Sequence, residues 1–422
     1  MKLAPDHDLI ERARKLGPLV ADHAEESDRD RRPSRHVVAA LREAGLFRLF
    51  TPRSLGGLEV DPLTCALVIE EVAGFDSAAG WSLMVANSVD WWCARLPADG
   101  PEEIYRDDPD TIIAAAFHPP IQAVQTDGGF EVTGRSPLAS NIHEATWVMF
   151  IAVVGDEPDA IGLIVRADEV EILDTWHTLG MRGTDSNDVA IDEVFVPRAR
   201  TFPLEPSFDP GPHYQSPLYR FPGIGEAAVV ICPTALAVAR RALDEMTDLA
   251  RTKAPFGSTV ALRGRPASQA RLARADAVLR SARLLFHDTV AEAWERATAG
   301  AEATLPDKAG LLLAGSHAVA SAVEAVDLVW SVAGTTGIYT RSRLERHFRD
   351  IHTMQHHGFV AESRYETAGQ VQRAKSPSSG SWRSERGRED HEGPHRHHVG
   401  LRRRREAGGV LATRPRLPRA RL

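Results

Sequence analysis

The sequence predicts an α+β protein, mainly helical, with helices at both ends and a sheet between them. Apolar residues recur at helical spacing over the first hundred residues and again after residue 220. Short β-branched runs bounded by Gly, Asp or Pro occupy the stretch between them, and 422 residues exceed what one core usually holds. We therefore expect an N-terminal helical domain, a middle antiparallel β domain and a C-terminal four-helix bundle.

Residues 1–110 form the predicted helical domain. In "PSRHVVAALREAGLF", Ser34 is a candidate N-cap and Gly45 stands where the helix would end. The stretch "DPLTCALVIEEVAGFDSAAGWSLMVANSVDWWCARLP" predicts two further apolar helices before Pro97. Such helices need other elements to cover their apolar faces.

Residues 111–204 form the predicted β domain. The runs "GGFEVTG", "ATWVMFIAVV", "AIGLIVRA" and "DVAIDEVFVP" are short, rich in β-branched residues and separated by turn residues. This pattern favours a small antiparallel sheet.

Residues 205–373 open on a proline-rich linker and then regain helical periodicity. Three long segments and the stretch "RDIHTMQHHGFVAESRYETAGQVQ", residues 349–372, predict the four helices of the bundle. Within this region, "GIGEAA", residues 223–228, matches the outline of a dinucleotide-binding glycine loop. Pro222 rather than a strand precedes it and no βαβ alternation surrounds it, so we interpret it as a helix start.

Residues 374–422 form a basic tail that we expect to be disordered. The tail holds 13 Lys and Arg against 5 Asp and Glu, which leaves a formal charge of -16 on the rest of the chain. Apart from Trp382 it lacks aromatic residues, and the body is acidic, so we do not expect nucleic-acid binding. An abrupt change to arginine-rich text is also what a reading-frame shift would produce.

The composition is that of an ordinary globular protein, with 43% hydrophobic and 26% charged residues. No uninterrupted apolar run reaches the roughly 18 residues of a membrane span, and the first residues lack the apolar core of a signal peptide. We therefore expect a cytoplasmic protein. Cys65, Cys93 and Cys232 are far apart and odd in number, which favours reduced core thiols.

The histidines of residues 349–372 raise the question of a metal site. His352 and His356 are spaced i, i+4 and could share a metal on a helix. No Glu lies between them as in HExxH and no third ligand is evident, so we expect none.

Two stretches resemble the sheet domain of the acyl-CoA dehydrogenase superfamily. "LGMRGTDSNDVAIDEVFVP", residues 179–197, is similar to the family pattern L-G-[MIL]-R-G-[ST]-x-[ST] followed by a strand that closes on V-P. "GRSPLASNIHEATWV", residues 134–148, resembles its flavin-contacting strand. Ser140 and Asn141 occupy the positions where the family has threonine and asparagine, and Leu138 replaces the usual tryptophan.

Two further stretches resemble the helical bundle of the same family. "KAPFG" is similar to an R-x-x-F-G turn that meets the flavin of a neighbouring subunit, which implies flavin contacts for Lys253 and Phe256. "YETAGQVQR", residues 365–373, resembles the terminal Y-E-G-T-x-Q-I-Q-R. The resemblance implies a flavin (FAD or FMN) between sheet and bundle, and usually a homotetramer.

Two branches share this fold, and the spacing after Asp350 distinguishes them. In dehydrogenases a glutamate eight residues after that aspartate removes a proton from an acyl-CoA. In this chain Glu366 follows Asp350 by 16 residues. His357 instead lies close to the position, counted from Asp350, that the dehydrogenase glutamate would occupy. The monooxygenase branch resembles this arrangement. "IIAAAFHPPIQAV", residues 112–124, also lacks the flavin-holding loop of dehydrogenases. We favour His357 over Glu366 as the catalytic proton-handling residue, because histidine titrates near neutral pH.

The resemblance therefore implies a two-component flavin monooxygenase that hydroxylates an aromatic or similar small molecule with reduced flavin from a partner reductase. An acyl-CoA dehydrogenase and a scaffold without flavin remain as alternatives. Relatives in the monooxygenase branch often carry a histidine after the tryptophan of the helical domain, and here that region offers other residues. Trp81, Asn87 and Trp91 are the candidate residues of an aromatic substrate pocket.

Overall fold

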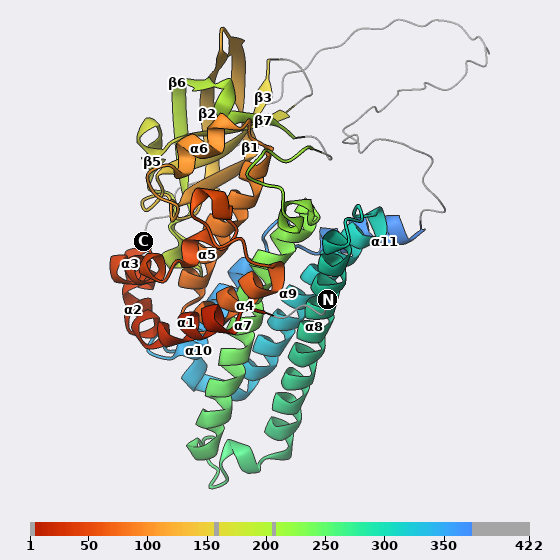
Figure 1. Cartoon of the computed structure of the whole chain (residues 1–422). Helices are drawn as coiled ribbons and strands as arrows, with labels where there is room; N and C mark the ends of the chain where they lie inside the picture. Colours follow the sequence, from red (N-terminus) through yellow and green to blue (C-terminus); the bar gives the residue numbers. More distant parts are fainter. Residues whose placement is uncertain (1–4, 156–159, 205–207, 374–422) are drawn as a thin grey trace, which may run out of the picture. The chain divides into compact units, whose positions relative to one another are not determined.

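The computed structural model describes residues 5–155, 160–204 and 208–373, and Figure 1 shows their elements coloured along the chain. The predicted order of helices, sheet and helices is confirmed. The basic tail, residues 374–422, lies outside the described residues, so its disorder stays a prediction.

The N-terminal region contains helices, and aspartate side chains cap the starts of some of them. They are α1 (His7–Lys15), α2 (Gly17–Asp30), α3 (Arg35–Glu43), α4 (Pro62–Ala73), α5 (Ser77–Trp92) and α6 (Asp99–Tyr105). The side chains of Asp61 and Asp76 accept backbone N–H groups in the first turns of α4 and α5, which satisfies donors that have no partner within the helix. Helix α3 starts after Ser34 as expected, although the Ser34 hydroxyl donates to Glu26 instead of capping.

The middle region is one mixed sheet. Its strands are β1 (Ile113–Thr126), β2 (Gly129–Ala139), β3 (Trp147–Val154), β4 (Ala160–Arg166), β5 (Glu171–Leu173), β6 (Asn187–Pro197) and β7 (Thr201–Pro203), in the spatial order β5-β6-β2-β1-β3-β4-β7.

The prediction of a purely antiparallel sheet needs one correction, because β1 and β3 pair in parallel. The hairpin at Gly128 folds β2 back along one edge of β1. The connection 140–146 then crosses the start of β1, so that β3 begins opposite Ile113 on the other edge and runs in the same direction. This crossing connection carries Ser140 and Asn141, and the topology thereby fixes their position.

The C-terminal region contains the long helices of the bundle: α7 (Gly223–Thr252), α8 (Pro266–Thr298), α9 (Leu305–Ala333), α10 (Arg343–Met354) and α11 (Ser363–Arg373). The start of α7 at Gly223 confirms the interpretation of "GIGEAA" as a helix start. The fourth predicted helix is interrupted, since α10 ends at Met354 and α11 begins at Ser363. His357 lies in the turn between them and not on a helix.

Helix α9 is the most apolar helix of the bundle. The segment Leu305–Ile338 is long and apolar enough to cross a membrane, but 67% of its most apolar window is buried inside the protein. It packs against α7 and α8, and its buried side chains belong to a core that also includes the N-terminal helices. The burial is that expected of a core helix in a bundle.

Candidate active site

Helix α5 places Trp81 against the connection that follows β2. Gly80 lets α5 approach α4 closely, since a Cβ at Gly80 would lie 2.4 Å from the Cβ of Ala73. The indole Nε1 of Trp81 donates a hydrogen bond to Ser140 Oγ at 3.2 Å. The same indole meets the imidazole of His357 edge-on, with 5.5 Å between ring centroids. Trp81 thus brings together the helical region, the sheet and the end of the bundle.

Asn141 locks the connection after β2 onto α5. Its φ of +62° is in the left-handed region, which asparagine tolerates better than most residues. The side-chain Oδ1 accepts a hydrogen bond from Ser82 Oγ at 2.6 Å, and Nδ2 donates to the Ser82 carbonyl at 3.0 Å. The backbone N–H of Asn141 donates to the carbonyl of Thr184 at 2.9 Å. These contacts hold Ser140 in place beside Trp81.

His357 is half-buried in the turn between α10 and α11. Its Nδ1 accepts the backbone N–H of Phe359 at 3.4 Å, so the neutral ring carries its proton on Nε2. Burial, together with the positive charge of Arg364, lowers the pKa of His357 to about 4. The ring is therefore neutral at pH 7. Within the described residues Nε2–H makes no hydrogen bond, which leaves it available to a ligand.

Glu366, the other candidate for proton transfer, lies on α11 and is exposed to solvent. The turn that places His357 against Trp81 ends before α11 begins at Ser363. The structure thus brings His357, and not Glu366, into contact with Trp81.

Asp350 fixes helix α10 to both other regions. Its buried carboxylate accepts the Ser77 hydroxyl at 2.6 Å and the backbone N–H of Met181 at 2.7 Å. Burial raises its pKa, whereas the hydrogen bond from Ser77 opposes that change. Gly180 packs against the backbone of α10, and a Cβ there would lie 2.3 Å from the carbonyl carbon of Arg349. The turn before β6 therefore fixes the position of α10, and the turn that carries His357 follows directly after this helix.

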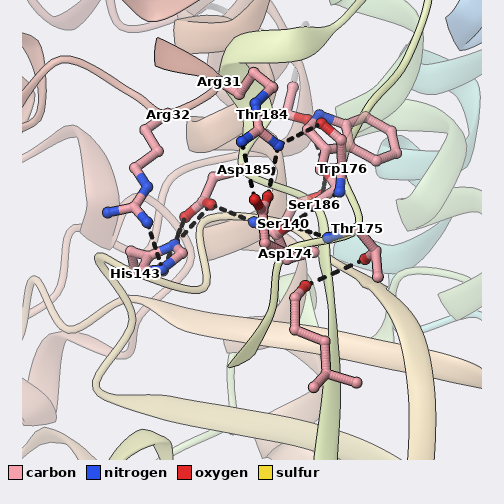
Figure 2. A network of polar contacts seen from close by, with 12 residues as sticks. Arg31, Arg32, Ser140, His143, Asp174, Thr175, Trp176, Thr184, Asp185 and Ser186 are labelled. Atoms are coloured by element: carbon pink, nitrogen blue, oxygen red, sulfur yellow. Dashed lines mark hydrogen bonds and ion pairs between the residues drawn. The ribbon is translucent and has the colours of Figure 1, made fainter. Parts of the chain in front are cut away.

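A line of buried hydroxyl groups runs from Ser140 to the same turn (Figure 2). Ser140 Oγ lies 2.7 Å from Ser186 Oγ, which lies 2.6 Å from Thr184 Oγ1. Thr184 Oγ1 donates to the carbonyl of Met181 at 2.9 Å. The predicted flavin-contacting serine is thus the end of a hydrogen-bonded chain that begins at a backbone carbonyl.

Next to this chain, His143 and Asp185 connect the sheet to the end of α2 (Figure 2). Arg32 can only donate, so Nε2 of His143 accepts its guanidinium N–H at 2.9 Å, and Nδ1–H donates to Asp185 Oδ1 at 2.8 Å. Arg31 pairs with Asp174 at 2.6 Å. These contacts hold the helical region against the turn that bears the hydroxyl chain.

The structure does not support a pocket role for Asn87 or Trp91. Asn87 is fully buried, and its amide bonds to four backbone groups: it accepts from Leu49 N and Phe50 N, and it donates to Leu46 O and Leu83 O. Trp91 is also buried, and its Nε1 donates to Leu218 O at 3.3 Å. Because α5 is buried over most of its surface, its polar groups serve packing, and among the three candidates Trp81 alone contacts His357.

Lys253 and Phe256 lie in the connection from α7 to α8. The ammonium group of Lys253 donates to the Ala333 carbonyl and the Thr336 hydroxyl, which ties this connection to the end of α9. Phe256 is fully exposed. Because Lys253 holds the connection between α7 and α8 in place, the exposed phenyl ring offers an apolar surface that another molecule can contact.

The described residues contain no group of three or more His, Cys, Asp or Glu side chains suited to a metal ion. His352 instead pairs through Nε2 with Asp327 at 3.0 Å, and Gln355 contacts its Nδ1. His356 is exposed.

The residues around Trp81 fit a planar ring with polar edges, such as a flavin. Leu138, two residues before Ser140, is 58% exposed and has a φ of +68°, a conformation that costs energy for a leucine. The Nε2–H of His357 is an unused donor, and Ser140 Oγ is a buried polar atom that, like the His357 ring, contacts Trp81. An apolar platform with a few fixed polar groups is the usual lining of a cofactor site.

Sequence reasoning assigned no role to Ser82, Thr184 or Ser186. Thr184 and Ser186 occupy the two [ST] positions of the pattern in residues 179–197, and that pattern was the available signal. Ser82 follows Trp81 in a buried helix, and no pattern marks it.

Comparison with known proteins matches both helical regions to one family. Residues 9–98 match the family model for the acyl-CoA dehydrogenase N-terminal domain, and residues 229–362 match that for the acyl-CoA dehydrogenase C-terminal domain.

Individual relatives are flavin-dependent oxygenases. The chain is 32% identical to an indole-3-acetate monooxygenase from Pseudomonas putida over 84% of this chain and 91% of the relative. It is 26% identical to the oxygenase component of an FADH2-dependent resorcinol hydroxylase from Rhizobium sp., over 83% of this chain and 90% of the relative. Among solved structures, XiaF from Streptomyces sp. in complex with FADH2 and glycerol has a TM-score of 0.83 at 25% identity, covering 89% of this chain and 97% of XiaF.

Proposed function

The chain belongs to the acyl-CoA dehydrogenase family, and from that premise we propose that it is the oxygenase component of a two-component flavin monooxygenase that hydroxylates a small aromatic molecule. Named relatives act on indole-3-acetate and resorcinol, which are aromatic compounds of this size. The observation that carries the proposal is the contact between His357 and Trp81, with Glu366 exposed on the next helix. A dehydrogenase needs a carboxylate base at this point.

Bound reduced flavin would supply the electrons that activate oxygen for insertion into the substrate. Ser140 and Asn141, on the connection after β2, would hold its ring, and Leu138 would give it an apolar surface. The flavin can be FAD or FMN.

His357 would act on the substrate or on developing charge through its Nε2 hydrogen. With a pKa lowered to about 4, the free imidazole is a weak base at neutral pH. Its unused Nε2–H is a hydrogen-bond donor, and a donor fixed in a half-buried site stabilises negative charge on oxygen. Its role would therefore be to donate a hydrogen bond, because a neutral imidazole has no acidic proton to transfer at this pH.

The partners in this proposal are a flavin reductase and three further copies of the chain. A relative described as an oxygenase component implies a separate reductase. The exposed ring of Phe256 and the anchored Lys253 would meet the flavin of a neighbouring subunit in a homotetramer. The enzyme would work in the cytoplasm.

The test supplies the purified protein with FAD or FMN, a flavin reductase, NADH and labelled dioxygen, and screens phenols, indoles and arylacetates. We expect a product that contains oxygen from dioxygen. Anaerobic reduction of the bound oxidised flavin by acyl-CoA thioesters would instead establish a dehydrogenase. If neither flavin binds in either redox state, the chain is a scaffold without flavin.

A further inference from the structure

The hydroxyl chain behind Ser140 has a defined direction. The Met181 carbonyl can only accept, so the bond between it and Thr184 uses the single hydroxyl hydrogen of Thr184. Thr184 Oγ1 must then accept from Ser186, and Ser186 Oγ must accept from Ser140. The reverse direction would lose the bond to Met181. All the observed bonds form together in one direction only.

This direction makes Ser140 a hydrogen-bond acceptor toward the candidate flavin site. Its hydrogen is engaged by Ser186, and one lone pair of its Oγ accepts the Trp81 Nε1–H. A hydroxyl oxygen has two lone pairs, so one remains. Ser140, Thr184 and Ser186 are all buried, with exposed fractions of 7%, 1% and 4%, so water competes little for these bonds.

The two redox states of a flavin would differ in what they need from Ser140 if the N5 edge of the ring faced its hydroxyl oxygen. Reduced flavin carries a hydrogen on the N5 nitrogen of its central ring and needs an acceptor there, whereas N5 of oxidised flavin is itself an acceptor. An acceptor opposite N5 of the oxidised ring would leave two facing acceptors and no hydrogen.

We propose that Thr184 and Ser186 are positioning residues that fix Ser140 as an acceptor and thereby make the site select reduced over oxidised flavin. The inference rests on the proposed function, in which Ser140 faces the flavin. It gives a physical reason why an oxygenase fed by a separate reductase would take up the reduced cofactor and release the oxidised one.

The test measures the dissociation constants of oxidised and reduced FMN and FAD for the full-length protein under anaerobic conditions. In Thr184→Val the hydroxyl is lost at nearly constant shape, so Ser186 and Ser140 can reorient. We expect the ratio of oxidised to reduced dissociation constants to fall about fivefold, the effect of one neutral hydrogen bond. That change corresponds to a shift of about 20 mV in the midpoint potential of the bound flavin.

Matched variants distinguish an effect of the hydroxyl chain on flavin binding from general damage to the fold. Thr184→Ser keeps the hydroxyl and should retain the wild-type ratio, whereas Ser186→Ala should lower it as Thr184→Val does. Ser136→Ala removes a different buried hydroxyl, which donates to Pro119 O from strand β2, and should leave the ratio unchanged.

The outcomes also separate this inference from the proposed function. If the wild type binds reduced flavin but the ratio is the same in Thr184→Val, Ser186→Ala and the wild type, the hydroxyl chain has no part in selecting reduced over oxidised flavin. A wild-type ratio of one or below overturns the inference as well. If the wild type binds neither redox state, the proposed function itself fails.

Discussion

The imidazole of His357 lies edge-on to the indole of Trp81, with 5.5 Å between ring centroids, although 276 residues separate them in the sequence. Helix α5 holds one ring and the interrupted end of the bundle holds the other. This contact defines the candidate active site.

Removal of the His357 side chain should impair hydroxylation far more than removal of Glu366. His357→Ala loses the unused Nε2–H donor, so we expect roughly a 100-fold decrease in kcat/KM, the scale of one fixed hydrogen-bond donor to developing negative charge. Glu366→Ala changes an exposed side chain and should stay within about twofold of wild type. The measurement is product formation at saturating reduced flavin, and the opposite order of effects would contradict the site assignment.

Gly180 should be intolerant of a side chain, because its Cβ would lie 2.3 Å from the α10 backbone. We expect Gly180→Ala to destabilise the protein by about 1–3 kcal/mol, the usual cost of overpacking. Gly358→Ala, in the turn that carries His357, is the matched control, since no atom lies within 4 Å of the added Cβ. Urea unfolding would measure both, and equal stability of the two variants would refute the proposed close packing.

Asp90 should make stability fall as the pH rises. Its carboxyl is fully buried between the Thr51 hydroxyl (2.5 Å) and the Tyr105 hydroxyl (2.6 Å), and burial raises its pKa from 3.8 to about 8. Between these two values the native state binds a proton that the unfolded state has lost. The contribution to the free energy of unfolding therefore decreases by up to about 1.4 kcal/mol per pH unit through that window.

Asp90→Asn removes this titrating proton and should flatten the pH dependence of unfolding between about pH 5 and pH 8. Urea unfolding at three pH values in that range provides the comparison. Asp107→Asn changes an exposed carboxylate of the same region and should keep the wild-type slope. Parallel curves for wild type and Asp90→Asn would show that the carboxyl is already ionised in the native protein.

Phe256 should matter for assembly and not for the fold of the subunit. Its ring is fully exposed, so Phe256→Ser should leave the unfolding midpoint unchanged while it lowers the assembled mass and weakens flavin binding. Phe195→Ser, on strand β6, removes another exposed phenyl ring (50% exposed) and should leave the mass unchanged. Light scattering measures the mass, and a monomeric wild type would remove the basis for a shared site.

The order of helices, sheet and helices follows from the amino-acid pattern alone, since the periodicities of 3.6 and 2 residues are local. The family resemblance of single stretches predicted flavin contacts for Ser140 and Asn141, and the count from Asp350 predicted a catalytic role for His357. The roles of these residues stay predictions, and choosing them required no knowledge of the packing.

What each side chain contacts depends on the packing of segments that are distant in the chain. This packing buried Asn87 among backbone groups, interrupted the last predicted helix at His357, and paired β1 with β3 in parallel. The direction of the hydroxyl chain depends on a carbonyl at Met181 whose position follows from the packing of Gly180 on α10. Such relationships join residues far apart in the chain. The direction of a hydrogen bond depends on all the partners of a hydroxyl group at once, so no local sequence pattern encodes that direction.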